Sequence, residues 1–338
     1  MLRLFFQIPW DTPTLINDKK VGFRVRPGAV FGVSAANSRG YNDREVTDRK
    51  TGHFRIGVIG DSFVFGTVSR QQNFVTILDS LCSTFDPGIE VINLGTPGFG
   101  PWNYAAVTAC DAVSLQVDLA VVVLFTGNDI RESHPDFTGR ITTGSFHFVL
   151  KKPWLVGPSL EYSMVFSTLR AAMRKISMVF SRKETALSEQ TFLSVERQRL
   201  DVCRIPPTPF YRKADQGFIM ALDAIQDSAA RAKMNVVFVI APDEFQVNAK
   251  LREKMERQFH LQWNRFDLNR PQEIASRHLG GGKGTVLDLL PVFNNSQLRD
   301  SLYTPFDTHW NTRGNRCAAE AIFAFLKAGF SPDTGVGR

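Results

Sequence analysis

The sequence predicts an α/β fold, a three-layer α/β/α domain built on a mostly parallel five-stranded sheet. The first observation is that short apolar segments alternate with segments of helical periodicity along much of the 338 residues, a pattern typical of βαβ units. The second is that residues 119–125 are unbroken apolar residues, as expected for a strand buried on both faces of a parallel sheet. The predicted strands span residues 54–59, 89–94, 119–125, 235–241 and 285–289.

Helices are expected between these strands, because apolar residues there recur every three or four positions. Residues 71–85 are an example, with Phe74, Ile77, Leu78 and Leu81 on one face. The other predicted helices span residues 102–115, 217–232, 247–258, 271–279 and 312–326.

Two parts of the chain fall outside this alternation. Residues 1–52 are polar and rich in turn-forming residues, so we expect an extended N-terminal arm that lies on the domain formed by residues 53–330. Residues 131–213 are expected to form a helical, basic insertion in that domain.

Within the insertion, residues 159–181 carry apolar side chains at helical spacing, opposed by Arg170, Arg174 and Lys175. This amphipathic pattern favours a helix packed on the core. The alternatives are a lid over the functional site and a helix that makes peripheral contact with a membrane surface.

The net charge of +7 is concentrated in the insertion. Residues 151–213 contain 12 Lys or Arg and 5 Asp or Glu, so the rest of the chain is close to neutral. A basic patch of this kind can attract nucleic acid, anionic lipid or an acidic glycan, although a solvated basic face is the simplest explanation. No nucleic-acid-binding motif accompanies it, so no nucleic-acid partner is expected.

Targeting and metal-binding signals are weak. No apolar run approaches the ~20 residues of a membrane span, and the apolar stretch in residues 1–10 is too short for a signal peptide. A cytoplasmic protein is expected, or an extracytoplasmic one if the chain lacks its true N-terminus. None of the four cysteines forms a C-x-x-C pair, so no zinc site is expected.

The chemistry is expected at Ser62, in the turn Gly60-Asp61-Ser62 directly after the first strand. In a parallel sheet, sites form beyond the carboxyl ends of the strands. A serine hydroxyl needs an adjacent base before it can act as a nucleophile. The alternative is that Ser62 only caps the following helix.

His309 is the candidate base. It lies in the turn that opens the last predicted helix, and Asp307, two residues earlier, could hold the imidazole in the required tautomer. His134 also has acidic neighbours, so a nearby carboxylate alone does not single out His309; its position does.

Two loops could donate hydrogen bonds to an oxyanion. Residues 95–100 follow the second strand and contain Gly98, where the backbone can approach a ligand closely. Gly127-Asn128-Asp129 follows the third strand, and the Asn128 amide can donate. Each loop could also be an ordinary turn between a strand and a helix.

Taken together, these segments resemble the four sequence blocks of the SGNH hydrolases, also called the GDSL esterase/lipase family. Gly60-Asp61-Ser62-Phe63 is similar to the first block, with Phe63 in place of the usual leucine. Gly98 matches the second block, Gly127-Asn128-Asp129 the third and Asp307-Thr308-His309 the fourth. The D-x-H-W-N form of the last block is more similar to the alginate O-acetyltransferase-like branch.

The resemblance implies a flavodoxin-like fold and a set of roles. Ser62 would be the nucleophile, His309 the base and Asp307 its orienting partner. The backbone N–H groups of Ser62 and Gly98 and the side chain of Asn128 would form the oxyanion hole. The resemblance implies no metal or organic cofactor.

The expected function is therefore a serine ester hydrolase that acts through an acyl-enzyme and removes O-acetyl groups from a carbohydrate. One alternative is an O-acetyltransferase that moves acetyl groups onto a polysaccharide. Another is a catalytically silent carbohydrate-binding protein on the same fold. A nucleotide-binding fold fits poorly, because the segment after the first strand lacks both the G-x-G-x-x-G pattern and the lysine of a phosphate-binding loop.

Overall fold

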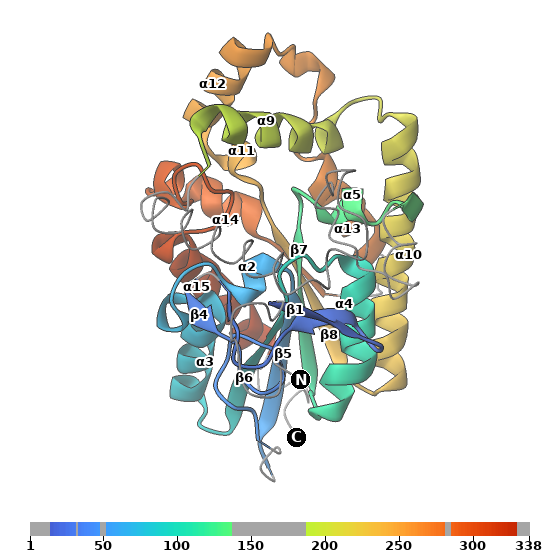
Figure 1. Ribbon diagram of the computed structural model, residues 1–338, viewed down its shortest axis with the longest axis vertical. Coiled ribbons are helices and arrows are strands. Elements are labelled where there is room, and N and C mark those ends of the chain that lie inside the picture. Colours follow the sequence, from blue (N-terminus) through green and yellow to red (C-terminus); the bar gives the residue numbers. More distant parts are fainter. Residues whose placement is uncertain (1–13, 32, 48–51, 137–186, 281–284, 330–338) are drawn as a thin grey trace, which may run out of the picture.

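A computed structural model describes residues 14–31, 33–47, 52–136, 187–280 and 285–329 (Figure 1). The predicted helix at residues 159–181, with most of the insertion, lies outside these ranges. The description below concerns the described residues alone.

The core is one five-stranded sheet in which every strand is parallel to its neighbours, where the sequence predicts a mostly parallel sheet. In spatial order the strands are β6 (Ile89–Gly95), β5 (Phe54–Gly60), β7 (Leu119–Phe125), β8 (Asn235–Ala241) and β9 (Thr285–Asp288). The chain moves from β5 to one side and then returns to the other, so the sheet has a topological switch point between β5 and β7. In sheets of this order, a site is expected outside the carboxyl ends of the strands at the switch point.

Helices cover both faces of the sheet, which gives the predicted three layers (Figure 1). One face packs against α3 (Phe74–Phe85), α14 (Leu289–Asn295) and α15 (Thr312–Gly329). The other packs against α4 (Pro101–Val107), α10 (Pro209–Arg231) and α13 (Arg270–Leu279).

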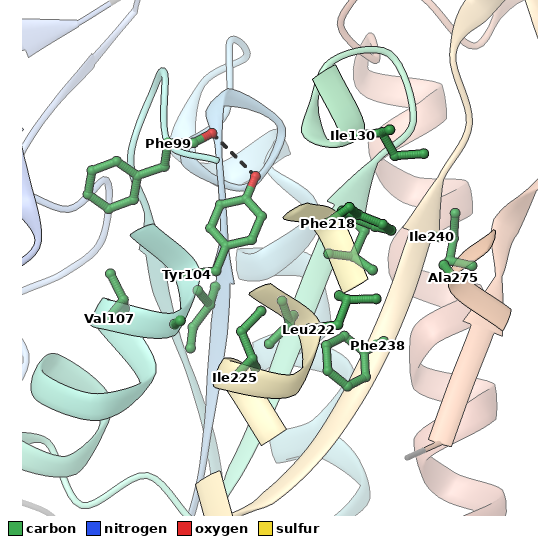
Figure 2. Close-up of a cluster of buried hydrophobic side chains, with 14 of the residues drawn as sticks. Phe99, Tyr104, Val107, Ile130, Phe218, Leu222, Ile225, Phe238, Ile240 and Ala275 are labelled. Atoms are coloured by element: carbon green, nitrogen blue, oxygen red, sulfur yellow. Dashed lines mark hydrogen bonds between the residues drawn. The ribbon is translucent and has the colours of Figure 1, made fainter. Parts of the chain in front are cut away.

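The apolar side chains of the second layer come from elements far apart in sequence. Figure 2 shows Tyr104 of α4, Phe218, Leu222 and Ile225 of α10, and Phe238 of β8 gathered in one cluster. All five are at most 2% exposed. Burial of this kind is the main stabilising contribution to the fold.

Some predicted helices have different limits in the structure. The helix predicted at residues 102–115 is α4 followed by a π-helical turn, η2 (Thr108–Ala112). The helix predicted at 247–258 is two helices, α11 (Glu244–Val247) and α12 (Ala249–Phe259), which meet at Asn248 because its side chain caps α12. The helix predicted at 217–232 begins earlier, at Pro209, where Thr208 is the N-cap.

The N-terminal residues 14–47 contain two short hairpins that the sequence pattern does not predict. They are β1 (Leu15–Asp18) with β2 (Gly22–Val25), and β3 (Val30–Phe31) with β4 (Ser34–Ala35). Strands of two to four residues are too short to show an alternating pattern. The first hairpin places the Phe23 ring 4.9 Å from the Phe99 ring, in the loop after β6.

The remaining elements are short or lie near the site. They are α2 (Ser62–Phe65), α5 (Asp129–Glu132), α9 (Glu189–Arg199), and the 3₁₀ turns η1 (Arg70–Gln72), η3 (Leu200–Cys203), η4 (Trp263–Arg265) and η5 (Arg299–Ser301). No described helix is both long and apolar enough to cross a membrane.

Trp310 is buried next to the site, in the layer that contains α3 and α14, and we expect its loss to be strongly destabilising. Its side chain is 2% exposed and packs against Phe63, Phe74 and Phe293. Trp310→Ala should lower the free energy of unfolding by about 3–5 kcal/mol, because it leaves a large cavity. Urea denaturation measures the free energy of unfolding. Trp263→Ala is the control, because the Trp263 side chain is more exposed than that of Trp310. Equal losses of stability in the two variants would contradict the prediction.

Candidate active site

Ser62 is the first residue of α2, directly beyond β5. The N-cap of α2 is Asp61, whose Oδ1 accepts a hydrogen bond of 2.8 Å from the Phe63 N–H. The interpretation of Ser62 as a cap is therefore wrong, since the preceding residue has that role. The Ser62 hydroxyl is left free to bond elsewhere.

A continuous set of hydrogen bonds joins Ser62, His309 and Asp307. The Nε2 atom of His309 lies 2.8 Å from Ser62 Oγ, and its Nδ1 atom lies 2.6 Å from Asp307 Oδ1. The same carboxylate oxygen accepts the backbone N–H of His309 at 3.1 Å. These contacts fix the orientation of the imidazole ring, so that Nε2 faces the Ser62 hydroxyl and Nδ1 faces Asp307.

The Asp307 carboxyl is held in its charged form. Burial raises its pKa, but the hydrogen bonds and charge of His309, together with the charge of Arg199, outweigh burial and hold the pKa below its usual value. A charged carboxylate next to Nδ1 favours the tautomer in which Nδ1 carries the proton.

Asn128 lies beside the residue that precedes Ser62. Its Nδ2 atom is 3.4 Å from Asp61 Oδ2 and 3.4 Å from Glu132 Oε1. Its Oδ1 atom is buried and has no hydrogen-bond partner in the described part of the chain. The amide therefore lies near the serine turn, held on its nitrogen side by two carboxyl groups.

Gly98 lies in the loop after β6, the strand next to β5. Its φ of +80° favours glycine, and a Cβ atom there would lie 3.7 Å from the Phe23 ring. The loop is joined to the serine turn, because the Thr96 N–H donates to the Gly60 carbonyl at 3.1 Å. No hydrogen bond joins Gly98 directly to Ser62 or Asn128 among the described residues.

Sequence reasoning did not single out a buried ionic cluster behind these loops. Arg199, at the end of α9, lies 3.3 Å from Glu196 and 3.7 Å from Asp243, and its guanidinium lies over the Phe125 ring at 5.3 Å. Asp243 follows β8 closely, so the strand-end rule could have found it. Arg199 belongs to the insertion, and no sequence signal places it here.

The Tyr104 side chain links the two candidate oxyanion loops. The Tyr104 hydroxyl lies 2.9 Å from Asp129 Oδ1 and 3.4 Å from the Phe99 carbonyl oxygen, the contact drawn in Figure 2. Asp129 in turn accepts the Phe125 N–H at 2.8 Å. The loops after β6 and β7 are thus held by one buried tyrosine.

The structure also shows the surroundings of His134, the other histidine with acidic neighbours, and allows a search for metal-binding groups. The His134 ring stacks on Phe210, with 4.2 Å between ring centres, and its nearest carboxylate is Asp136 at 3.6 Å. Among the described residues, no group of three or more His, Cys, Asp or Glu is placed to hold a metal ion.

Burial raises the pKa values of several carboxyl groups, and we expect stability to fall as pH rises. Burial, the largest cause, raises the pKa of Asp43 to about 6, of Glu244 to about 7 and of Glu132 to about 8. Between its unfolded and folded pKa values, each group is protonated only in the folded state. Each therefore lowers the free energy of unfolding by up to about 1.4 kcal/mol per pH unit as pH rises through that window.

The measurement is the melting temperature from about pH 5 to pH 8 at constant ionic strength. Glu244→Gln should flatten the dependence, since a glutamine cannot release a proton. A melting temperature that rises steadily across this range would contradict the assignment.

Comparison with known proteins gives matches among solved structures only. No protein-family model matches the sequence, and no curated protein matches it. A lipolytic protein of the G-D-S-L family from Desulfitobacterium hafniense is 13% identical, with a TM-score of 0.41, over 80% of this chain and 99% of that chain. An acetyl xylan esterase is 13% identical, with a TM-score of 0.46, over 81% of this chain and 100% of that chain.

A catalytic mutant of an acetylxylan esterase from Geobacillus stearothermophilus is 11% identical, with a TM-score of 0.43, over 82% of this chain and 95% of that chain. At such low identities and TM-scores, the function has to be inferred from the residues of the site itself. The chain is similar to solved structures of GDSL (SGNH) lipolytic proteins and acetylxylan esterases, at low sequence identity.

Proposed function

We propose that this protein is a serine ester hydrolase that acts through an acyl-enzyme and removes O-acetyl groups from a carbohydrate. One observation carries the proposal: His309 lies 2.8 Å from the Ser62 hydroxyl through Nε2 and 2.6 Å from Asp307 through Nδ1. A nucleophile, a base and an orienting carboxylate in hydrogen-bonded sequence are the requirement for activating a serine.

In the first half of the reaction, Ser62 Oγ attacks the ester carbonyl carbon while Nε2 of His309 takes the hydroxyl proton. The resulting imidazolium lies against the Asp307 carboxylate, which stabilises its positive charge. His309 then gives the proton to the departing alcohol, and the acyl group remains on Ser62.

The negative charge that develops on the carbonyl oxygen needs hydrogen-bond donors. The backbone N–H groups of Ser62 and Gly98 and the Asn128 side chain are the proposed donors, which come from the loops after β5, β6 and β7. Removing one donor of this kind typically lowers kcat by about 10²- to 10³-fold.

In the second half, an acceptor attacks the acyl-enzyme with His309 again as the base. Water as the acceptor completes hydrolysis. A sugar hydroxyl as the acceptor would give the alternative function, O-acetyl transfer to a polysaccharide, with the same residues in the same roles.

The space beside the serine favours a small acyl or alcohol group. A shallow depression with almost no enclosed volume is lined by Ser62, Phe63, Gly66, Thr67, His309, Trp310 and Asn315. This is below the ~300–1,000 Å³ of sites for drug-sized ligands. We therefore expect kcat/KM for p-nitrophenyl acetate to exceed that for p-nitrophenyl octanoate by at least about tenfold, and the reverse order would contradict an acetyl substrate.

The test compares wild type with Ser62→Ala on p-nitrophenyl acetate and on an acetylated xylan, with released acetate as the readout. Ser69→Ala is the matched control, because Ser69 lies in the next turn and bonds Gln72. A parallel assay follows acetyl transfer to a glycan. If wild type is no faster than Ser62→Ala in hydrolysis and also fails to transfer acetyl groups, the proposed function is wrong.

A further inference from the structure

Glu132, the last residue of α5, lies between the two loops proposed to hold the oxyanion. Its Oε1 atom is 3.4 Å from Asn128 Nδ2, and its backbone N–H donates to the Asn128 carbonyl at 2.8 Å. A Cβ atom on Gly100 would lie 3.2 Å from Glu132 Oε2. The Glu132 side chain thus touches Asn128 on one side and the Gly98–Gly100 loop on the other.

We propose that Glu132 is a positioning residue, which holds the Asn128 side chain and the Gly98–Gly100 loop in the geometry needed to bind an oxyanion. This inference rests on the proposed function, since it concerns the same site. Glu132 acts through Asn128 and does not touch the reacting atoms.

The contacts of Asn128 explain why it needs such support. Its Oδ1 atom has no partner among the described residues, so the amide is held through Nδ2 by Asp61 and Glu132. Both contacts are long, at 3.4 Å. One Nδ2 hydrogen can therefore move to the oxyanion while the other keeps a carboxyl partner, and loss of Glu132 would leave Asp61 alone to orient the amide.

The protonation state of Glu132 also matters to an oxyanion nearby. Burial, followed by the charge of Asp61, raises the pKa of Glu132 to about 8, although Arg131, Arg199 and the Asn128 hydrogen bond act in the opposite direction. Asp129 and Tyr104 also lie close enough to interact with this carboxyl. The carboxyl is thus mostly neutral at pH 7.

Ionisation above pH 8 would add a negative charge beside the developing oxyanion and beside Asp61. The rate is therefore expected to fall as pH rises through the Glu132 pKa. A glutamine, which is neutral at every pH, would remove this fall and keep a group of similar size against Asn128.

The experiment measures kcat and KM of the full chain for p-nitrophenyl acetate from about pH 5 to pH 9, corrected for spontaneous hydrolysis. We expect Glu132→Ala to lower kcat by about 10- to 100-fold with KM changed less than about threefold. Glu132→Gln should recover most of that loss at pH 7 and shift the alkaline fall upward by at least about one pH unit.

A double-mutant cycle tests whether Glu132 acts through Asn128. In the Asn128→Ala background, Glu132→Ala should change kcat by less than about threefold, because the group that it positions is already gone. Glu244→Gln is the matched control: Glu244 is also a buried acid of raised pKa, but its carboxyl accepts from Asn248. This control should leave the alkaline fall in place.

The outcomes separate the two proposals. If wild type is active but Glu132→Ala and Glu132→Gln keep the wild-type kcat and pH profile, the role of Glu132 is overturned and the esterase proposal stands. If wild type is no faster than Ser62→Ala in hydrolysis and also fails to transfer acetyl groups, both fall. Should Glu132→Ala fail to fold, as judged by its melting curve, the pH profile of Glu132→Gln still decides.

Discussion

Replacing His309 with alanine is expected to lower kcat for acetyl-ester hydrolysis by about 10⁴- to 10⁶-fold. Without the imidazole, no described group lies within hydrogen-bond distance of Ser62 Oγ to take its proton, and a neutral hydroxyl is a poor nucleophile. KM should change little, because His309 is needed mainly in the transition state. Steady-state kinetics with p-nitrophenyl acetate and with an acetylated glycan measure both constants.

His278 provides the control for this substitution. Its Nε2 atom lies 2.9 Å from Asp223 Oδ1, a histidine–aspartate pair between α13 and α10 without the serine. His278→Ala should leave kcat within about threefold of wild type. The double variant Ser62→Ala/His309→Ala should be no slower than either single variant, since the two groups act as a unit. A further loss in the double variant would mean that they act independently.

The strands were predictable from sequence because the sheet is buried on both faces. Residues 119–125 and 235–241 were predicted as strands with the limits that β7 and β8 have. In β7 every residue is buried, so the apolar run has no polar interruption and its ends are clear. The predicted α/β/α fold with its five-stranded sheet is confirmed.

Short elements and helix interruptions were not predictable, because they depend on contacts made in the folded state. The π-helical turn at Thr108–Ala112 carries Asp111, which bonds Tyr41 and Arg24 of the N-terminal segment. Nothing in the local sequence indicates that partner. The break at Asn248 likewise depends on one side chain that caps a helix.

The candidate site was partly predictable, because the strand-end rule identifies loops but not what lies behind them. The rule predicts that Ser62, Asn128 and Gly98 lie at one edge of the sheet. His309 was predicted from its position in the turn before α15. The strand-end rule did not predict that Glu132 and Asp61 would share the Asn128 amide. That arrangement depends on the burial of two carboxyl groups, which the sequence pattern of α5 does not show.

Asp307→Asn is expected to lower kcat by about 10⁴-fold while the protein stays folded. An asparagine can still accept the backbone N–H of His309 through its oxygen, so the turn should survive. It cannot supply the negative charge that stabilises an imidazolium. Because the backbone N–H and Nδ1 of His309 meet the same oxygen, an amide turned to place its NH₂ group there would lose the backbone contact, donate to Nδ1 and leave the proton on Nε2, the wrong tautomer to accept the serine proton.

Asp300→Asn is the control, because it also replaces an aspartate with asparagine in the segment before His309 but outside the set of hydrogen bonds that joins Asp307, His309 and Ser62. Asp300 is an exposed residue of η5, 3.9 Å from Lys250, and its substitution should leave kcat within about threefold. Because the pKa of Asp307 is held below its usual value, the carboxylate is charged throughout the working range and adds no step of its own to the pH profile. Asp307→Asn should therefore lower the rate at every pH from about 5 to 9. A variant with near wild-type kcat at neutral pH would show that His309 is oriented without Asp307.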